Sequence, residues 1–222
     1  QAFNIYLMPG QNLVSLPLQP TSGTDFDIAT LLNQLAPNSN LGAGAKLSDV
    51  IDTISYFTGG TAATGTWLVY ATGPAADTLT TVTTGWAYWI KMKDGVFKLS
   101  DPLAPGLPQT PAPIKLTIVG QFLKPGDVPP TYDVVKDWNM RGLHAENPRL
   151  VDSQFLRGVS SGVAVPPGIW VSLLEYQNFL KFVEDAPPEI KLGAFNSLMG
   201  TDLALPGTGF WLLMGGPGTI AP

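Results

Sequence analysis

The sequence predicts a mainly β protein made of two tandem, related antiparallel modules, each sandwich-like or barrel-like with one or two short helices. Short runs of alternating apolar and polar residues are separated by Gly, Pro, Asn and Asp along the whole chain, a pattern typical of strands and turns. A proline-rich segment divides the 222 residues nearly in half. The two halves repeat the same short motifs in the same order, which indicates an internal repeat.

Strands are expected where a run alternates or is rich in β-branched and aromatic residues. Asp94 and Gly95 separate two such runs, and this pair favours a two-residue hairpin because both turn positions need positive φ. The expected strands are 3–7, 12–18, 53–57, 66–71, 86–92, 96–99, 114–119, 131–135, 139–144, 170–174, 178–183 and 209–214.

Helical spacing of apolar residues is found in only three places. Over 25–36 the apolar residues recur with a period near 3.6 and Pro37 ends the pattern, so we expect a helix capped by Thr24 or Asp25. A second short helix is expected around 47–54, and a third over 150–159. Each module therefore has one or two short helices.

The segment 101–113 is rich in proline and carries few side chains able to build a core. Proline fixes φ and favours an extended, semi-rigid path, so this segment is interpreted as a linker. The expected domains are a first β-rich module at 1–100 and a second at 114–222.

Two pairs of matched motifs define the repeat. The segment 11–16 (QNLVSL) matches 138–143 (WNMRGL), and 85–92 (GWAYWIKM) matches 207–214 (GTGFWLLM). Chance similarity between two β domains with aromatic alternation is the alternative. Within the repeat, Trp89 and Trp211 occupy matched positions and are assigned to equivalent cores. The expected core anchors are Asn12, Gly85, Tyr88, Trp89, Asn139, Gly207, Phe210 and Trp211.

The segments 10–17 (GQNLVSLP) and 85–90 (GWAYWI) carry a family resemblance. They resemble the tandem repeat modules of large bacterial and archaeal cell-surface and S-layer-associated proteins, which often read Gly-Trp-Asn-Leu-Ile-Ser-Leu-Pro and later Gly-Lys-Gly-Tyr-Trp-Ile. Gln11 stands where those modules often have Trp. The resemblance implies a structural role at the cell surface and brings no catalytic residues with it. Gln1 before a strand-like segment suits the end left by signal-peptide removal, although a boundary within a longer chain would look the same.

Charged residues make up only 13% of the chain, against about 25% in a typical soluble protein. The net charge is −5 and no run of Lys and Arg is present, which argues against nucleic acid or an anionic membrane as partner. No stretch approaches about 18 consecutive apolar residues, so membrane insertion is not expected. A surface so poor in charge favours copies of the same chain as partners.

The sequence offers no convincing catalytic, cofactor or metal site. His144 is the only histidine, no Gly-x-Ser-x-Gly motif is present and cysteine is absent, which leaves no nucleophile elbow and no thiolate zinc site. Of the carboxylate clusters, Asp25 with Asp27 and Asp49 with Asp52 fall where helices are expected to start, as caps do. The third, Glu184 and Asp185 with Glu189, lies in a proline-rich loop. We therefore expect a protein that is not an enzyme and needs no cofactor.

Two tryptophans are candidates for an exposed contact or for stacking on a sugar. Trp86 matches Thr208 in the other half, so the module does not need it, and Trp67 lies in a threonine-rich stretch. They support the alternative function, a carbohydrate-binding or adhesive module of a larger surface protein, with glycans as partners.

The run 114–119 (IKLTIV) precedes the second copy, whereas the first copy begins almost at Phe3. One hypothesis is that this strand, with Ile114, Leu116 and Ile118, fills an open position in another subunit and so builds filaments or lattices. The alternative is that it folds back within its own chain. The expected function is thus an extracellular structural subunit of a surface layer, sheath or filament, which self-associates through weakly charged surfaces and edge strands.

Overall fold

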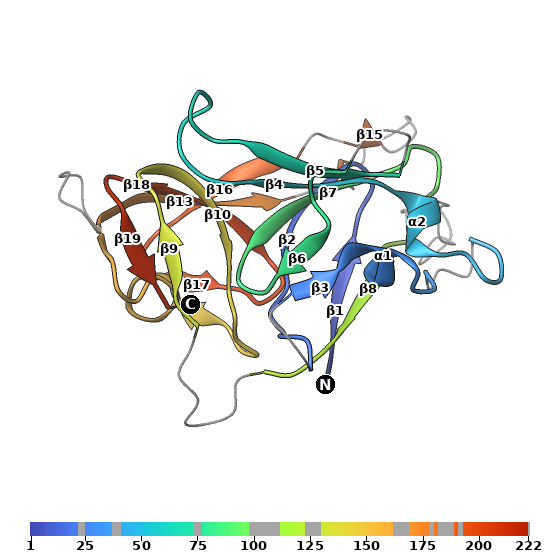
Figure 1. Ribbon diagram of the computed structural model, residues 1–222, viewed down its shortest axis with the longest axis horizontal. Coiled ribbons are helices and arrows are strands. Elements are labelled where there is room, and N and C mark those ends of the chain that lie inside the picture. The colour runs from blue at the N-terminus through green and yellow to red at the C-terminus, as the bar shows by residue number, and fades with distance from the viewer. Residues whose placement is uncertain are drawn as a thin grey trace.

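The computed structural model describes residues 1–21, 25–36, 41–72, 77–97, 112–122, 130–161, 169–177, 180–181, 189–190 and 193–221. Figure 1 shows a mainly β molecule whose first half, blue to green, lies beside its second half, yellow to red. Several antiparallel sheets and a few short helices make up the fold, which confirms the predicted mainly β, sandwich-like class. Below, the first half is residues 1–122 and the second half is residues 130–221. None of the helices in the described ranges is long and apolar enough to cross a membrane.

A four-stranded antiparallel sheet forms the centre of the first half. Its order is β2 (Gln11–Ser15), β7 (Ala87–Met92), β4 (Ile51–Phe57) and β5 (Trp67–Ala71). The remaining elements are two strand pairs, β1 (Ala2–Leu7) with β8 (Ile114–Val119) and β3 (Asp25–Asp27) with β6 (Thr81–Thr83), and the helices α1 (Ile28–Leu32) and α2 (Leu47–Val50).

The second half has its own sheet, in the order β10 (Asp137–Gly142), β18 (Gly209–Met214) and β13 (Ile169–Gln177), with β12 (Ser160–Ser161) and β16 (Ala194–Leu198) both paired to β13. Its other elements are the pairs β9 (Tyr132–Val134) with β19 (Gly218–Ile220), β11 (Arg149–Leu150) with β17 (Leu203–Ala204) and β14 (Leu180–Lys181) with β15 (Glu189–Ile190), and a π-helix, η1 (Val151–Phe155).

The halves pair their strands in the same order. β10, β18, β13 and β16 follow one another across the second sheet as β2, β7, β4 and β5 do across the first, and the pairs β9–β19 and β11–β17 correspond to β1–β8 and β3–β6. A short helix follows the strand β3 in one half and β11 in the other. This order agrees with the repeated motifs, while the duplication itself stays a prediction.

Contacts between the halves are reciprocal. The Ser15 amide donates to the Gly207 carbonyl (2.9 Å), and the Gly142 amide, at the position that matches Ser15, donates to the Gly85 carbonyl (2.8 Å). Gly85 and Gly207 also match each other in the repeat. Each half therefore presents the same backbone groups to the other, as two subunits do in an isologous interface.

The strand β8 belongs to the first half, and this corrects the domain boundary expected from the sequence. It pairs antiparallel with β1 over its whole length, from Ala2 opposite Val119 to Leu7 opposite Ile114, and Figure 1 shows the two strands side by side. The first module thus extends past residue 100, and the second does not begin at 114. Proximity to the second copy in sequence was misleading because the last strand of each half returns to its first strand.

The same pairing answers the question of the open strand position. Ile114, Leu116 and Ile118 are buried in the core of the first half. The position beside β1 is filled by the chain itself, so the role of this strand as a donor to another subunit is replaced by the alternative, folding back within the chain. Alternation explains the burial, because every second residue of a strand faces the same side.

The helices lie where the sequence predicts them but are shorter. α1 begins after β3, so its cap is Asp27, whose Oδ2 accepts a hydrogen bond from the Thr30 amide (2.7 Å), and not Thr24 or Asp25. The Thr30 hydroxyl also donates to this carboxylate (2.8 Å), and the hydrogen bonds from the Thr30 hydroxyl and amide lower the pKa of Asp27. η1 takes the place of the helix expected over 150–159.

The hairpin expected at Asp94-Gly95 does not form within the described residues. Gly95 has φ 72°, as a tight turn requires, but residues 96–97 are not in a strand. The turn expected over 124–127 and most of the linker 101–113 lie outside the described residues.

Candidate functional site

The repeat anchors Asn12 and Asn139 make the same local structure in each half. Asn12 accepts a hydrogen bond from the Met8 amide (2.8 Å) and donates to the Met8 carbonyl (2.8 Å). Asn139 does the same with the Val135 amide (2.9 Å) and carbonyl (2.8 Å). Both side chains are buried. Each asparagine thus closes the turn that joins the first two strands of its half, a role that the sequence assigned only as a core anchor.

The anchors Gly85 and Gly207 are required by backbone conformation and by close packing. Their φ values are 77° and 82°, in the region that favours glycine. A Cβ at Gly85 would lie 2.6 Å from the ring of Tyr132 in the other half, and one at Gly207 would lie 2.8 Å from the ring of Phe3. These glycines therefore serve the contact between the halves.

The aromatic anchors divide between two environments. Tyr88 and Phe210 are fully buried in the cores of their own halves, as the sequence predicts, and burial raises the pKa of Tyr88. Trp89 and Trp211 are only partly buried and point to the opposite face of each sheet. Both pack against the core of the first half, so they do not lie in equivalent module cores as expected. They pack where the halves meet, because alternation along a strand places neighbours on opposite faces.

These tryptophans are the centre of an aromatic seam between the two sheets. The ring centroid of Trp89 lies 4.7 Å from that of Tyr176 and 6.2 Å from that of Phe195. In the reciprocal contact Trp211 lies 5.6 Å from Phe57 and 6.0 Å from Trp67. Distances of this size are usual for favourable aromatic pairs. The aromatic seam is formed by Phe57, Trp67, Trp89, Tyr176, Phe195 and Trp211.

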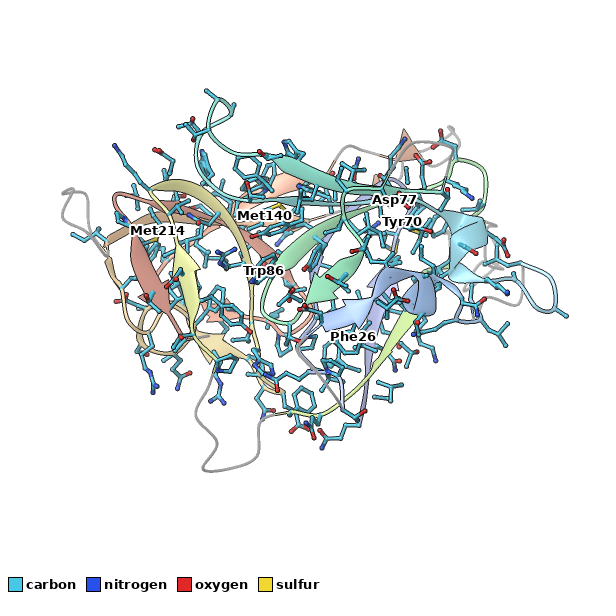
Figure 2. The ribbon with its side chains drawn as sticks, viewed as in Figure 1. Phe26, Tyr70, Asp77, Trp86, Met140 and Met214 are labelled. Carbon is cyan, nitrogen blue, oxygen red and sulfur yellow. The ribbon has the colours of Figure 1, made fainter. Side chains whose placement is uncertain are left out.

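Trp86 is not the exposed contact expected from the sequence. The Trp86 ring stacks on Tyr56 with centroids 4.4 Å apart. The guanidinium of Arg141, from the second half, lies 5.7 Å from the Trp86 ring centroid. Figure 2 labels Trp86 near Met140 in the middle of the molecule, where the halves meet. The prediction was wrong because Trp86, just before β7, forms an isolated antiparallel β-bridge with Arg141 and does not face the solvent.

Arg141 is a buried cation that sequence reasoning did not single out. Its Nη1 donates to the Tyr56 hydroxyl (3.0 Å) and the Met140 carbonyl (2.8 Å), and its Nη2 donates to the Asp133 carbonyl (2.5 Å). Within the described residues no carboxylate lies at ion-pair distance from it. The Tyr56 hydroxyl, the two carbonyl oxygens and the face of the Trp86 ring take the place of a counter-ion. Arg141 therefore has a structural role in the contact between the halves.

Beside the aromatic seam, the first sheet forms a groove of about 460 Å³. Trp67 is 46% exposed there, in agreement with its selection from the sequence as an exposed aromatic. The first-sheet groove is lined by Gln11, Thr53, Ser55, Trp67, Val69, Trp89 and Tyr176.

The second sheet has a hollow of about 250 Å³ at the corresponding place, which we call the second-sheet patch. Ser55 lies across from Trp89 on the first sheet, and Leu174 lies across from Trp211 on the second. Because the two tryptophans match in the repeat, Ser55 and Leu174 occupy matched positions. The second-sheet patch is lined by Trp138, Leu174, Phe195 and Trp211, so it is apolar where the first-sheet groove is polar and aromatic.

His144 lines a separate pocket of about 360 Å³ together with Glu146, Arg149 and Arg157. Its side chain is 3% exposed, and neither ring nitrogen has a hydrogen-bond partner among the described residues. Burial lowers the pKa of His144 to about 4, so the imidazole is neutral at pH 7. No nucleophile is hydrogen-bonded to it, and this arrangement does not make a general base.

His144 gives a prediction about the pH dependence of stability. Its pKa is about 6.5 in the unfolded chain and about 4 in the fold, so the unfolded state binds more protons between these values and stability falls as pH is lowered through this window. His144→Leu removes this contribution, and the free energy of unfolding of the variant should exceed that of the wild type by more at pH 4.5 than at pH 7. Urea titrations at both pH values measure it; an equal difference at both would contradict a neutral, buried imidazole.

The carboxylates noted in the sequence have structural partners. Asp25 accepts from the Thr83 hydroxyl (2.6 Å), Asp49 accepts from the Lys46 amide (2.7 Å), and Asp52 pairs with Lys91 (2.7 Å). Among the described residues no group of three His, Cys, Asp or Glu side chains is placed to hold a metal ion.

The fold defines the chain as a mainly β protein in which a four-stranded and a five-stranded sheet pack together. Comparisons with protein-family models, with curated proteins and with solved structures found no match. The geometry described above leaves two candidate functional surfaces, the second-sheet patch and the first-sheet groove.

Proposed function

We propose that the protein is a non-catalytic structural subunit of an extracellular prokaryotic assembly and that it associates with copies of itself through the second-sheet patch and the adjoining strand β16. The resemblance to repeat modules of cell-surface proteins supports the surface location. The observation that carries the proposal is an uncharged edge strand beside an apolar patch, on a molecule that is only 13% charged.

The strand β16 is an open edge in the described part of the chain. It pairs with β13 alone, and its sequence AFNSL contains no charged residue and no proline. Four of its five residues are exposed, and the side chain of Phe195 is 51% exposed. Soluble proteins usually block such an edge with lysine, proline or a bulge, so β16 is suited to pairing with another strand.

The corresponding edge of the first sheet is protected. The Val69 amide donates to the Thr78 hydroxyl (2.9 Å), the Ala71 amide donates to Asp77 Oδ1 (3.0 Å), and the Val69 carbonyl accepts from the Thr78 amide (2.9 Å). The segment after β5 therefore occupies the hydrogen-bonding groups that β16 leaves available. Only one of the two matched edges is suited to association.

The second-sheet patch determines the kind of partner. Its lining is aromatic and aliphatic, so a partner must bring apolar surface, and a second copy brings the same patch. Pairing β16 with β16 of the copy would join the second sheets of the two copies and place both patches side by side, in a closed, isologous contact. We propose this dimer as the elementary contact of the assembly.

Sedimentation velocity over a range of concentrations tests the proposal. Wild-type protein should form dimers or larger species, and Leu174→Ser and Phe195→Ser should each weaken association by about tenfold or more because they remove apolar contact area. Leu35→Ser, at another exposed leucine (67% exposed), is the control and should associate as the wild type does. A wild-type monomer at every concentration, with no polymer in electron micrographs, would overturn the proposal.

A further inference from the structure

We propose that the first-sheet groove binds a neutral glycan chain. The groove lies on the first sheet, with one wall residue, Tyr176, from the second, and the inference does not depend on self-association.

The floor of the groove follows from strand register. Gln11 and Thr53 each lie across from Lys91, and Ser55 lies between Trp89 on one neighbouring strand and Val69 on the other. Residues in these positions share one face of a sheet. The floor therefore combines one amide and two hydroxyl side chains with the face of a tryptophan, in adjacent rows about one strand spacing apart.

Aromatic side chains form the walls. Trp67 comes from the edge strand β5, and Tyr176 comes from β13 of the other half, with its ring 4.7 Å from that of Trp89. Trp67 is also held by Phe57 (5.3 Å) and Trp211, yet it is 46% exposed. Its orientation is therefore fixed before a ligand arrives, which lowers the entropy cost of binding.

The groove has the chemistry that sugars require. A pyranose ring has faces of C–H groups that pack on aromatic rings and a rim of hydroxyls that exchange hydrogen bonds with amides and hydroxyls. The volume of about 460 Å³ falls within the usual range of about 300–1,000 Å³ for ligand sites. The site is open along the sheet, so a chain is favoured over a single enclosed sugar.

Charge selects a neutral chain. No charged side chain is among the described residues that line the groove. Lys91, which lies between Gln11 and Thr53 on the same face of the sheet, is held in an ion pair with Asp52 at 2.7 Å. An acidic glycan or a phosphate would need Arg or Lys donors directed into the site. Uronic acids and phosphorylated sugars are therefore expected to bind poorly.

The corresponding place on the second sheet differs in this chemistry, although Ser172 keeps a hydroxyl at the position that matches Thr53. Leu174 replaces Ser55, and Trp138 stands at the position that matches Gln11. The residues that line the second-sheet patch offer aromatic faces without the Ser55 hydroxyl or the Gln11 amide. One glycan site per chain is expected. The leucine at position 174, which matches Ser55, suggests Ser55→Leu as a test variant.

The probes are cellohexaose, maltohexaose, mannohexaose and chitohexaose, with polygalacturonate as the acidic comparison. Binding of each is measured by calorimetry and by tryptophan fluorescence of the intact protein. At least one neutral probe should bind and polygalacturonate should not. Binding of none of the neutral probes, or of polygalacturonate alone, would overturn the inference.

Two variants then place the binding in the groove. Trp67→Ala and Ser55→Leu should each weaken the bound probe by about tenfold or more, which corresponds to about 1.4 kcal/mol. Ser55→Leu introduces the residue found at the matched position, so the sheet should tolerate it, and thermal melting confirms the fold. Leu35→Ala is the control with unchanged binding. Full binding by both groove variants would overturn the site.

The two proposals fail separately. Glycan binding is read by fluorescence at protein concentrations below those at which sedimentation detects association. A protein that stays monomeric but binds a neutral probe would support the glycan site and overturn the proposed assembly. A protein that polymerises but binds none of the probes would support the assembly and overturn the glycan site.

Discussion

Gly142→Ser is expected to destabilise the protein by about 3 kcal/mol or more, the range of severe overpacking at a closely packed site. A Cβ at position 142 would overlap the Cβ of Ser15, would lie 2.6 Å from its Oγ and would lie 3.1 Å from the Trp86 carbonyl. The clash lies between the halves, where the Gly142 amide also donates to the Gly85 carbonyl (2.8 Å). The backbone has no room to withdraw without breaking this bond.

The repeat supplies the compensating change. Ser15 and Gly142 match, so Ser15→Gly combined with Gly142→Ser exchanges the small residue between the halves and should recover most of the lost stability. Ser15→Gly alone should cost about 1 kcal/mol, because the Ser15 hydroxyl donates to the Thr208 carbonyl (2.8 Å) and a net hydrogen bond contributes about that much. Urea unfolding followed by circular dichroism measures all three variants. Wild-type stability of Gly142→Ser alone would show that the halves do not approach so closely.

Local features of the fold could be predicted from the sequence because they depend on short segments. The matched asparagines and glycines mark turns whose geometry is set within a few residues, and the helices α1, α2 and η1 fall where apolar spacing changes. The same reasoning selected Trp67 as a candidate exposed aromatic, since it lies in a threonine-rich stretch.

Features that depend on distant partners could not be predicted. The pairing of β8 with β1 joins residues more than a hundred positions apart, across a segment whose sequence carries no pairing information. Arg141 interacts with Tyr56 and Trp86 of the other half, and nothing in the residues beside it indicates burial. The strands β3 and β17 have three and two residues, too few to show alternation.

The groove and the patch illustrate the same limit. Alternation places Ser55 and Leu174 on a strand face, but only the register relative to Trp89 and Trp211 shows that they match. Because Ser55 and Leu174 differ at matched positions, the two surfaces differ in polarity, whereas the repeat alone predicts two equivalent surfaces. A polar floor suits an exposed ligand site and an apolar floor suits a protein contact, so divergence within one scaffold accounts for two different surfaces.

Asn139→Ala is expected to cost about 3 kcal/mol, because it removes three hydrogen bonds of a buried side chain and a net hydrogen bond contributes about 1 kcal/mol. The Val135 amide and carbonyl and the Asp137 carbonyl (3.0 Å) all lose the bond that the side chain provides. Asp137 has φ 72°, an unfavourable conformation for a residue with a Cβ, and the asparagine helps to hold it. Unfolding in urea gives the change in free energy.

Asn12→Ala tests whether the two halves are stabilised by the same device. Asn12 makes the same bonds to Met8, and the residue with positive φ in its turn is Gly10 (φ 82°). The cost should be about 2–3 kcal/mol because the corresponding hydrogen bonds of the buried side chain are lost. Asn147→Ala, at an exposed asparagine, should change stability by less than about 0.5 kcal/mol. If Asn12→Ala and Asn139→Ala both changed stability as little as this control, the two asparagine side chains would not stabilise the fold. A large loss in only one half would show that the matched motifs do not have matched roles.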